Sequence, residues 1–184
     1  MKKMIYIGIT GNRDISNKQS TFIKKNIEHF LKKSSENKNL EEIIILTPLA
    51  DGVDRIIADV VLDSFSDMKI LVPLPFSEEI YKNSFGKGLK INNISQAESI
   101  REYEDLLEKI KKHNKCDNIY INLKFDKENY LNQNIEEQRK IRNEQYALLG
   151  EYLIEKSDIL IAVYDKNSVN KRLMLWQTIA FSKG

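Results

Sequence analysis

Residues 45–62 have the sequence ILTPLADGVDRIIADVVL, in which a short apolar run is followed by a polar loop and then by an amphipathic pattern. The run that ends at Leu46 is apolar throughout, which is typical of a strand buried on both faces. From residue 52 to residue 62 the apolar side chains recur at helical spacing, at Val53, Ile56, Ile57, Val60 and Val61. A strand followed directly by a helix predicts a βαβ unit and therefore a parallel sheet.

The same alternation of strands and helices extends along the rest of the chain. The predicted strands are residues 4–9, 42–46, 69–74, 118–123 and 158–164. The predicted helices are residues 17–33, 52–62, 77–84, 95–112, 135–156 and 173–182. This order predicts a mainly parallel sheet that is covered by helices on both faces.

We expect one domain, residues 1–184, with a variable and less regular insertion at about 76–133. The first helix is expected to begin at a cap formed by Ser16 or Asn17. A helix that ends in Lys183 and Gly184 usually leads into another strand, because glycine suits the position after a helix. The final strand of the sheet is therefore expected to be absent after Gly184.

The composition restricts the classes of partner. With 29 basic and 27 acidic side chains, the net charge of +2 gives no electrostatic signal for nucleic-acid binding, and it leaves a local basic patch open. The single cysteine, Cys116, excludes an internal disulfide and indicates a reducing compartment. A metal site at Cys116 and His113 would need further ligands, and the only other histidine is His29. No signal peptide or membrane-spanning run is apparent, so we expect a cytoplasmic protein without metal, cofactor or membrane partner.

Polar residues and glycines follow the predicted strands, at the edge where parallel strands end. They occupy residues 10–14, 47–55 and 165–167. Ligands of open parallel sheets bind at this edge, near the point where the strand order reverses. The sequence therefore predicts a binding site formed by these loops.

The groups in these loops suit an anionic, polyhydroxylated ligand such as a nucleotide. Gly11 and Gly52 allow the backbone to turn tightly or to approach a ligand, and N–H groups at the helix start near Gly52 can bind phosphate. Guanidinium groups bind phosphate with paired hydrogen bonds, and carboxylates bind ribose hydroxyls. The expected anion partners are Arg13 and Arg55, and the expected hydroxyl partner is Asp51 or Asp54.

Each of these residues also has a structural alternative. Asp51 is a suitable N-cap for the helix that follows it. Arg55 is spaced to form a salt bridge with Asp51 or Asp59 on its own helix. Gly11 suits a simple turn, and Arg13 suits a solvated loop. The loops alone leave both interpretations open.

Four segments, in this order, resemble the SLOG superfamily: ITGNRD, TPLADGVDRIIAD, VPLPF with Tyr81 and Phe85 after it, and RNEQYALLGEYLIEKSDILIAVYD. This group includes the DNA-processing protein DprA/Smf and the Lonely-Guy phosphoribohydrolases, and the likeness is to a bacterial branch with GxTGHR and PLAEGADR. The resemblance covers most of the chain apart from roughly its middle third. It implies a Rossmann-like three-layer α/β/α fold with a mainly parallel sheet and an irregular helical insertion in the middle.

The resemblance also implies a nucleotide-derived small molecule at the carboxyl edge of the sheet. In many such proteins the domain is a sensor in signalling or antiphage defence and regulates an attached or separate effector. The ligand-binding residues that the resemblance implies are Thr10, Gly11, Asn12, Arg13, Leu49, Ala50, Asp51, Gly52, Asp54, Arg55, Arg142 and Asn143.

The sequence departs from known patterns at several positions. Asn12 stands where histidine is common in that branch, and NKRLMLWQT replaces the glycine-rich segment expected after the last strand. Lys171 and Arg172 offer positive charge there, and Trp176 offers a stacking surface; helix-end solvation and core packing are their structural alternatives. The absence of PGGxGTxxE, G-x-G-x-x-G and G-x-x-x-x-G-K-[ST] argues against a phosphoribohydrolase, a dinucleotide dehydrogenase and a P-loop NTPase.

Three functions follow from these observations. The first is a nucleotide sensor in bacterial defence or stress signalling, with no catalytic residues. The second, which keeps an enzymatic role open, is a nucleotide hydrolase that uses Glu144, Glu151 or Asp54 as acid or base. The third is DprA-like binding of single-stranded DNA, which the charge balance disfavours. Homo-oligomers are expected, because the apolar helix at 173–181 would lack its covering strand.

Overall fold

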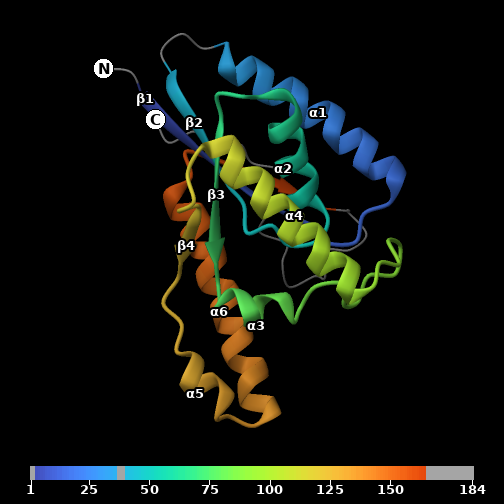
Figure 1. The fold of residues 1–184 in the computed structure, drawn as a ribbon, viewed down its shortest axis with the longest axis vertical. Helices are drawn as coiled ribbons and strands as arrows, with labels where there is room; N and C mark the ends of the chain where they lie inside the picture. The colour runs from blue at the N-terminus through green and yellow to red at the C-terminus, as the bar shows by residue number, and fades with distance from the viewer. Residues whose placement is uncertain (1–2, 37–39, 165–184) are drawn as a thin grey trace.

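A computed structural model describes residues 3–36 and 40–164 of the chain. Strands and helices alternate along it as the sequence predicts (Figure 1). The strands are β1 Lys3–Gly11, β2 Leu40–Leu46, β3 Lys69–Leu74, β4 Tyr120–Asn122 and β5 Ile159–Val163. The helices are α1 Asn17–Ser35, α2 Val53–Ser64, α3 Glu78–Lys82, α4 Gln96–Asn114, α5 Lys127–Leu131 and α6 Ile135–Lys156.

The five strands form one parallel sheet in the order β4-β3-β2-β1-β5. The chain moves outward from β1 to β4 and then returns to place β5 on the other side of β1. The strand order therefore reverses between β1 and β5, where Gly11 pairs with Val163 at the carboxyl ends of the two strands. Ligands of doubly wound sheets bind outside this point.

Helices cover both faces of the sheet. The layer of α1, α2 and α4 lies on one face, and α6 lies on the other (Figure 1). Because successive side chains of a strand point to opposite faces, Ile43 and Ile45 of β2 pack in the core under the first layer, while Ile44 and Leu46 pack with α6. This arrangement confirms the predicted three-layer, Rossmann-like α/β/α fold.

Most of the predicted elements are present with small shifts of their ends. The third strand and the long helix have the predicted bounds, and α1 begins after Ser16, which forms a capping box with Gln19. Helix α5 was not predicted, because five residues are too few to show a helical period. The helix predicted at 173–182 and the expected absence of a further strand lie outside the described residues.

The middle region, predicted as an insertion at 76–133, contributes to the sheet itself. Strand β3 pairs with β2 through residues 69–71 and with β4 through residues 72–74. Pro73, which has no N–H group, lies in the half that faces β4. Helix α4 packs on α2 and on β3, so this region supplies both an edge strand and a covering helix.

Candidate functional site

The loops after β1 and β2 meet at the carboxyl edge of the sheet. Gly52 caps α2 with a φ of 82° and without a side-chain hydrogen bond. A Cβ on Gly52 would lie well inside contact distance of the carbonyl oxygens of Asn12 and Arg13. The Val53 N–H donates to the Asn12 carbonyl at 3.1 Å, so the loop after β1 supplies the acceptor for the first N–H group of α2. The alternative that Asp51 caps this helix is therefore wrong.

Gly11 lies where β1 and β5 come together. A Cβ on Gly11 would be 2.6 Å from the Val163 carbonyl oxygen and 2.8 Å from the Cβ of Val53. The Asn12 N–H donates to the same Val163 carbonyl at 2.9 Å. Close approach of two strands and a helix explains the glycine at this position.

The Asp51 carboxylate is the centre of a buried polar cluster. It is 4% exposed and accepts hydrogen bonds from the Arg13 guanidinium, the Ser99 hydroxyl and, at 3.1 Å, the Gly86 N–H. Arg55 Nη2 lies 3.1 Å from the same carboxylate. Burial alone would raise the pKa of Asp51, but these hydrogen bonds and the two positive charges outweigh it and lower the pKa. Asp51 is therefore ionised and joins several segments.

The Arg55 side chain is buried and connects α2 to α4. Its Nε donates to the carbonyl of Leu49 at 3.1 Å, and its Nη1 donates to the Ser99 carbonyl at 2.9 Å. The guanidinium also lies 4.8 Å from the centre of the Phe85 ring. The salt bridge between Arg55 and Asp51 confirms the structural alternative for Arg55, and direct contact with an anion stays a prediction.

Asp54 lies beneath this loop and is almost completely buried. Its carboxyl group accepts the Ala50 N–H at 3.2 Å. Burial raises the pKa of Asp54 to about 8, with a smaller rise from Asp51, against the lowering effects of the Ala50 hydrogen bond and of Arg55 and Arg13. Asp54 is therefore protonated at neutral pH and does not neutralise the arginines.

The raised pKa of Asp54 predicts a specific loss of stability with pH. The folded chain keeps this proton up to about pH 8, whereas the unfolded chain releases it above about pH 4, so stability is full below pH 4 and is lost as pH rises to 8. Asp54→Asn removes this dependence. Between about pH 5 and pH 8 the wild type should lose on the order of 3 kcal/mol more unfolding free energy than the variant. Urea unfolding at both pH values measures this difference, and equal losses would contradict the burial of an ionisable Asp54.

A cavity of about 250 Å³, which we call the Arg13 cavity, opens beside this cluster. Its lining residues are Arg13, Ala50, Tyr81, Ser84, Phe85 and Tyr146. The Arg13 side chain is 37% exposed and donates to the Ser84 carbonyl at 2.7 Å. Its Nε is buried without a hydrogen-bond partner among the described residues. The single negative charge of Asp51 is shared between the guanidinium groups of Arg13 and Arg55. The positive charge of Arg13 is therefore only partly neutralised by Asp51 at the cavity.

Aromatic rings form much of the remaining wall of the Arg13 cavity. The rings of Tyr81 and Phe85 pack edge to face with their centres 4.9 Å apart. Tyr146, on α6, is 37% exposed. Arg142, one turn earlier on that helix, lies 3.4 Å from the hydroxyl oxygens of both Tyr146 and Tyr130. The predicted residue Arg142 thus positions a cavity residue and does not line the cavity itself.

Two other predicted residues, Thr10 and Asn143, are not among the lining residues of this cavity. Thr10 Oγ1 is 3.2 Å from the Tyr164 hydroxyl, and both residues line a groove of about 420 Å³ between α6 and β5. Tyr146 borders the groove as well as the Arg13 cavity. Asn143 is exposed on α6. The structure therefore brings the loop residues together and leaves Asn143 apart.

The segment between α3 and α4 is held against the strand ends by the charged residues of the predicted loops. The Asp14 carboxylate accepts N–H groups from Lys90, Ile91 and Asn92, at 2.6, 2.9 and 2.9 Å. Burial would raise the pKa of Asp14, but these three donors outweigh it and lower the pKa. Asp14 therefore fixes the far end of the segment, as Asp51 fixes its beginning.

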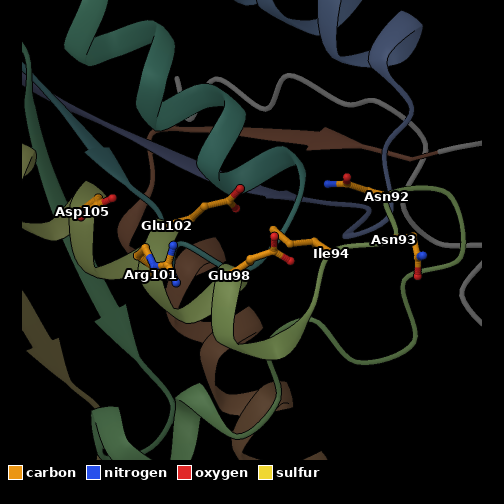
Figure 2. A pocket seen from close by; sticks show the side chains of 7 residues that line it. All are labelled: Asn92, Asn93, Ile94, Glu98, Arg101, Glu102 and Asp105. Atoms are coloured by element: carbon orange, nitrogen blue, oxygen red, sulfur yellow. The ribbon is translucent and has the colours of Figure 1, made fainter.

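A second cavity, of about 440 Å³, lies between this segment and α4 (Figure 2). Its charged lining residues are Glu98, Arg101, Glu102 and Asp105. Carboxylates outnumber the guanidinium here, so the cavity disfavours an anion. In the described part of the chain, no group of three or more His, Cys, Asp or Glu side chains is placed to hold a metal ion.

Of the residues that the sequence predicted to face a ligand, Arg13 and Ala50 line this cavity, and contact with a ligand stays a prediction. The aromatic wall of the cavity was not predicted. Tyr81 and Phe85 occur in a segment of the SLOG resemblance, which is a signal that could have included them. Tyr146 follows Arg142 by one helical turn, which places the two side chains on the same face. That Tyr146 of α6 lines the same cavity as Arg13 and Ala50 depends on tertiary packing, which no local sequence pattern indicates.

No protein-family model matches the chain, and no curated protein matches it. Over residues 3–36 and 40–164, none of the helices has the length and apolar character needed to cross a membrane.

Proposed function

We propose that the protein binds a nucleotide or nucleotide-derived anion at the carboxyl edge of its sheet and acts as a sensor. The observation that supports this most directly is the Arg13 cavity, in which a partly exposed guanidinium faces several aromatic rings. A guanidinium binds phosphate or carboxylate, and an aromatic ring packs against a base. Arg13 follows β1, which is one of the two strands between which the strand order reverses.

The electrostatics of the buried cluster also support an anionic ligand. Asp54 is protonated at neutral pH, so Asp51 is the buried carboxylate that balances Arg13 and Arg55. Glu102 lies 3.3 Å from Arg55 but is 57% exposed. An anionic ligand bound at Arg13 would neutralise the part of the Arg13 charge that Asp51, shared with Arg55, does not.

The resemblance to SLOG domains supplies the biological part of this proposal. A sensor in bacterial defence or stress signalling would report the ligand to an attached or separate effector. Self-association of the chain stays a prediction. Hydrolysis is less well supported, because no carboxylate among the described residues lines the Arg13 cavity, and Glu144 is exposed on α6.

Calorimetric titration with AMP, ADP-ribose, NAD and cyclic nucleotides tests the proposal. At least one of them should bind, and Arg13→Ala should weaken its binding at least about tenfold, because the anion loses its guanidinium partner. Tyr146→Ala should weaken binding by a smaller factor without removing a buried ion pair. Chromatography of the same mixtures for released base would distinguish binding from cleavage.

Arg101→Ala is the matched control, since it removes an exposed arginine from the acidic cavity and not from the Arg13 cavity. Its affinity for the nucleotide should equal that of the wild type. The proposal fails if none of these nucleotides binds, or if Arg101→Ala weakens binding as much as Arg13→Ala does.

A further inference from the structure

The buried carboxyl group of Asp54 lies next to the Arg13 cavity without a charged partner of its own. The side chain is 3% exposed and accepts the N–H of Ala50, a residue that lines the cavity, at 3.2 Å. Within residues 3–36 and 40–164 no salt bridge reaches Asp54, whereas Asp51 pairs with both Arg13 and Arg55. A buried carboxyl group without a cation partner holds its proton, because burial disfavours the charged form.

The charged and titratable groups that act on Asp54 come from several segments. Among the described residues they are Arg55 on α2, Arg13 after β1, Asp51 after β2 and Tyr81 on α3. Burial raises the pKa of Asp54 to about 8, although the two guanidinium groups favour its ionised form and lower the pKa. A change in the net charge at Arg13 therefore changes how readily Asp54 ionises.

We propose that an anion bound at Arg13 retains the proton of Asp54, so that the protein binds this anion less tightly in alkaline solution. The inference rests on the proposed function, which places an anion in the Arg13 cavity. The bound anion neutralises positive charge that favours ionised Asp54 and brings a negative charge close to it. Both effects raise the pKa of Asp54 in the complex. By linkage, the anion must then bind less tightly to the protein that has lost the proton.

The pKa of Asp54 sets the pH range of this effect. Below about pH 8 the free protein and the complex both keep the proton, so the affinity does not change with pH. Above about pH 8 the free protein loses the proton and the complex keeps it. Binding then takes up a proton, and the affinity falls by up to about tenfold per pH unit. Ionised Asp54 replaces the anion as a counter-charge for Arg13, and it acts without touching the ligand.

Binding of inorganic sulfate and of AMP between about pH 7.5 and pH 9.5 tests this inference, since both anions keep a constant charge in this range. At fixed ionic strength, the affinity of the wild type should be constant up to about pH 8 and then fall several-fold. At about pH 8, where the fold is most secure in this range, calorimetry in two buffers of different ionisation enthalpy should detect uptake of up to about half a proton. Circular dichroism must show the native helix content at each pH.

Two variants on α2 separate this effect from other titrations. Asp54→Asn keeps a side-chain oxygen for the Ala50 N–H and removes the titrating group, so its affinity should not change over this range and its binding should take up no proton. Asp59→Asn is the matched control. Burial also raises the pKa of Asp59, but this residue lines a separate cavity together with Lys109 and not the Arg13 cavity. It should keep the fall in affinity of the wild type.

The two anions distinguish failure of this inference from failure of the proposed function. If sulfate binds with the expected pH dependence and neither AMP nor another nucleotide binds, the proposed function fails and the proton linkage stands. If AMP binds equally well at both ends of the pH range without proton uptake, or if Asp54→Asn behaves as the wild type does, the linkage is overturned and the proposed function stands. Binding of neither anion would overturn both.

Discussion

Replacement of Asp51 by alanine is expected to lower the free energy of unfolding by about 3–5 kcal/mol, because it leaves the buried guanidinium of Arg55 without its buried partner. Asp51 is 4% exposed and lies between the guanidinium groups of Arg13 and Arg55. The Ser99 hydroxyl and the Gly86 N–H would lose their acceptor at the same time. Urea unfolding followed by circular dichroism measures the effect.

Glu102→Ala is the matched control for this prediction. Glu102 also pairs with Arg55, at 3.3 Å, but its side chain is 57% exposed. Removal of an exposed partner should cost no more than about 1 kcal/mol. Combining Asp51→Ala with Arg55→Met should recover part of the loss, because the buried charge is then removed as well. Equal effects of Asp51→Ala and Glu102→Ala would show that Asp51 is not the centre of the cluster.

The roles of Asp51 and Arg55 show where sequence reasoning succeeds and where it ends. The spacing of these two residues predicted their salt bridge, which is a local interaction. Their contacts with Ser99 join positions 48 and 44 residues apart. Nothing in the sequence around Ser99 indicates a contact with Asp51 or Arg55. The hydrogen bonds that connect α4 to the loop after β2 were therefore not predictable from periodicity.

The fold was predictable because its signals are local and repeated. Apolar strands alternate with amphipathic helices, and Ser16 followed by Gln19 marks a helix start. The structural alternative that Asp51 caps α2 is wrong because Gly52 occupies the cap position, with a positive φ that an aspartate would adopt only under strain. The Asp51 carboxylate therefore does not cap α2, and it accepts the Gly86 N–H from the segment after α3 instead.

Gly52→Ala is expected to lower the free energy of unfolding by on the order of 3–4 kcal/mol, from backbone strain and steric overlap together. The φ of 82° is unfavourable for any residue with a Cβ. That Cβ would also overlap the carbonyl oxygens of Asn12 and Arg13, which are backbone atoms and cannot rotate away. The overlap would displace the loop that positions the Arg13 guanidinium, so nucleotide binding should weaken in the same variant.

Gly88→Ala separates these two contributions. Gly88 has a similar φ of 77°, but no heavy atom of the described residues lies within 4 Å of a Cβ at this position. Its replacement should cost only the strain, about 1–2 kcal/mol, and should leave nucleotide affinity unchanged. If the two variants lose the same stability in urea, the close approach of the loops after β1 and β2 does not contribute. If Gly52→Ala alone loses both stability and affinity, the packing of these loops is what places Arg13 at the cavity.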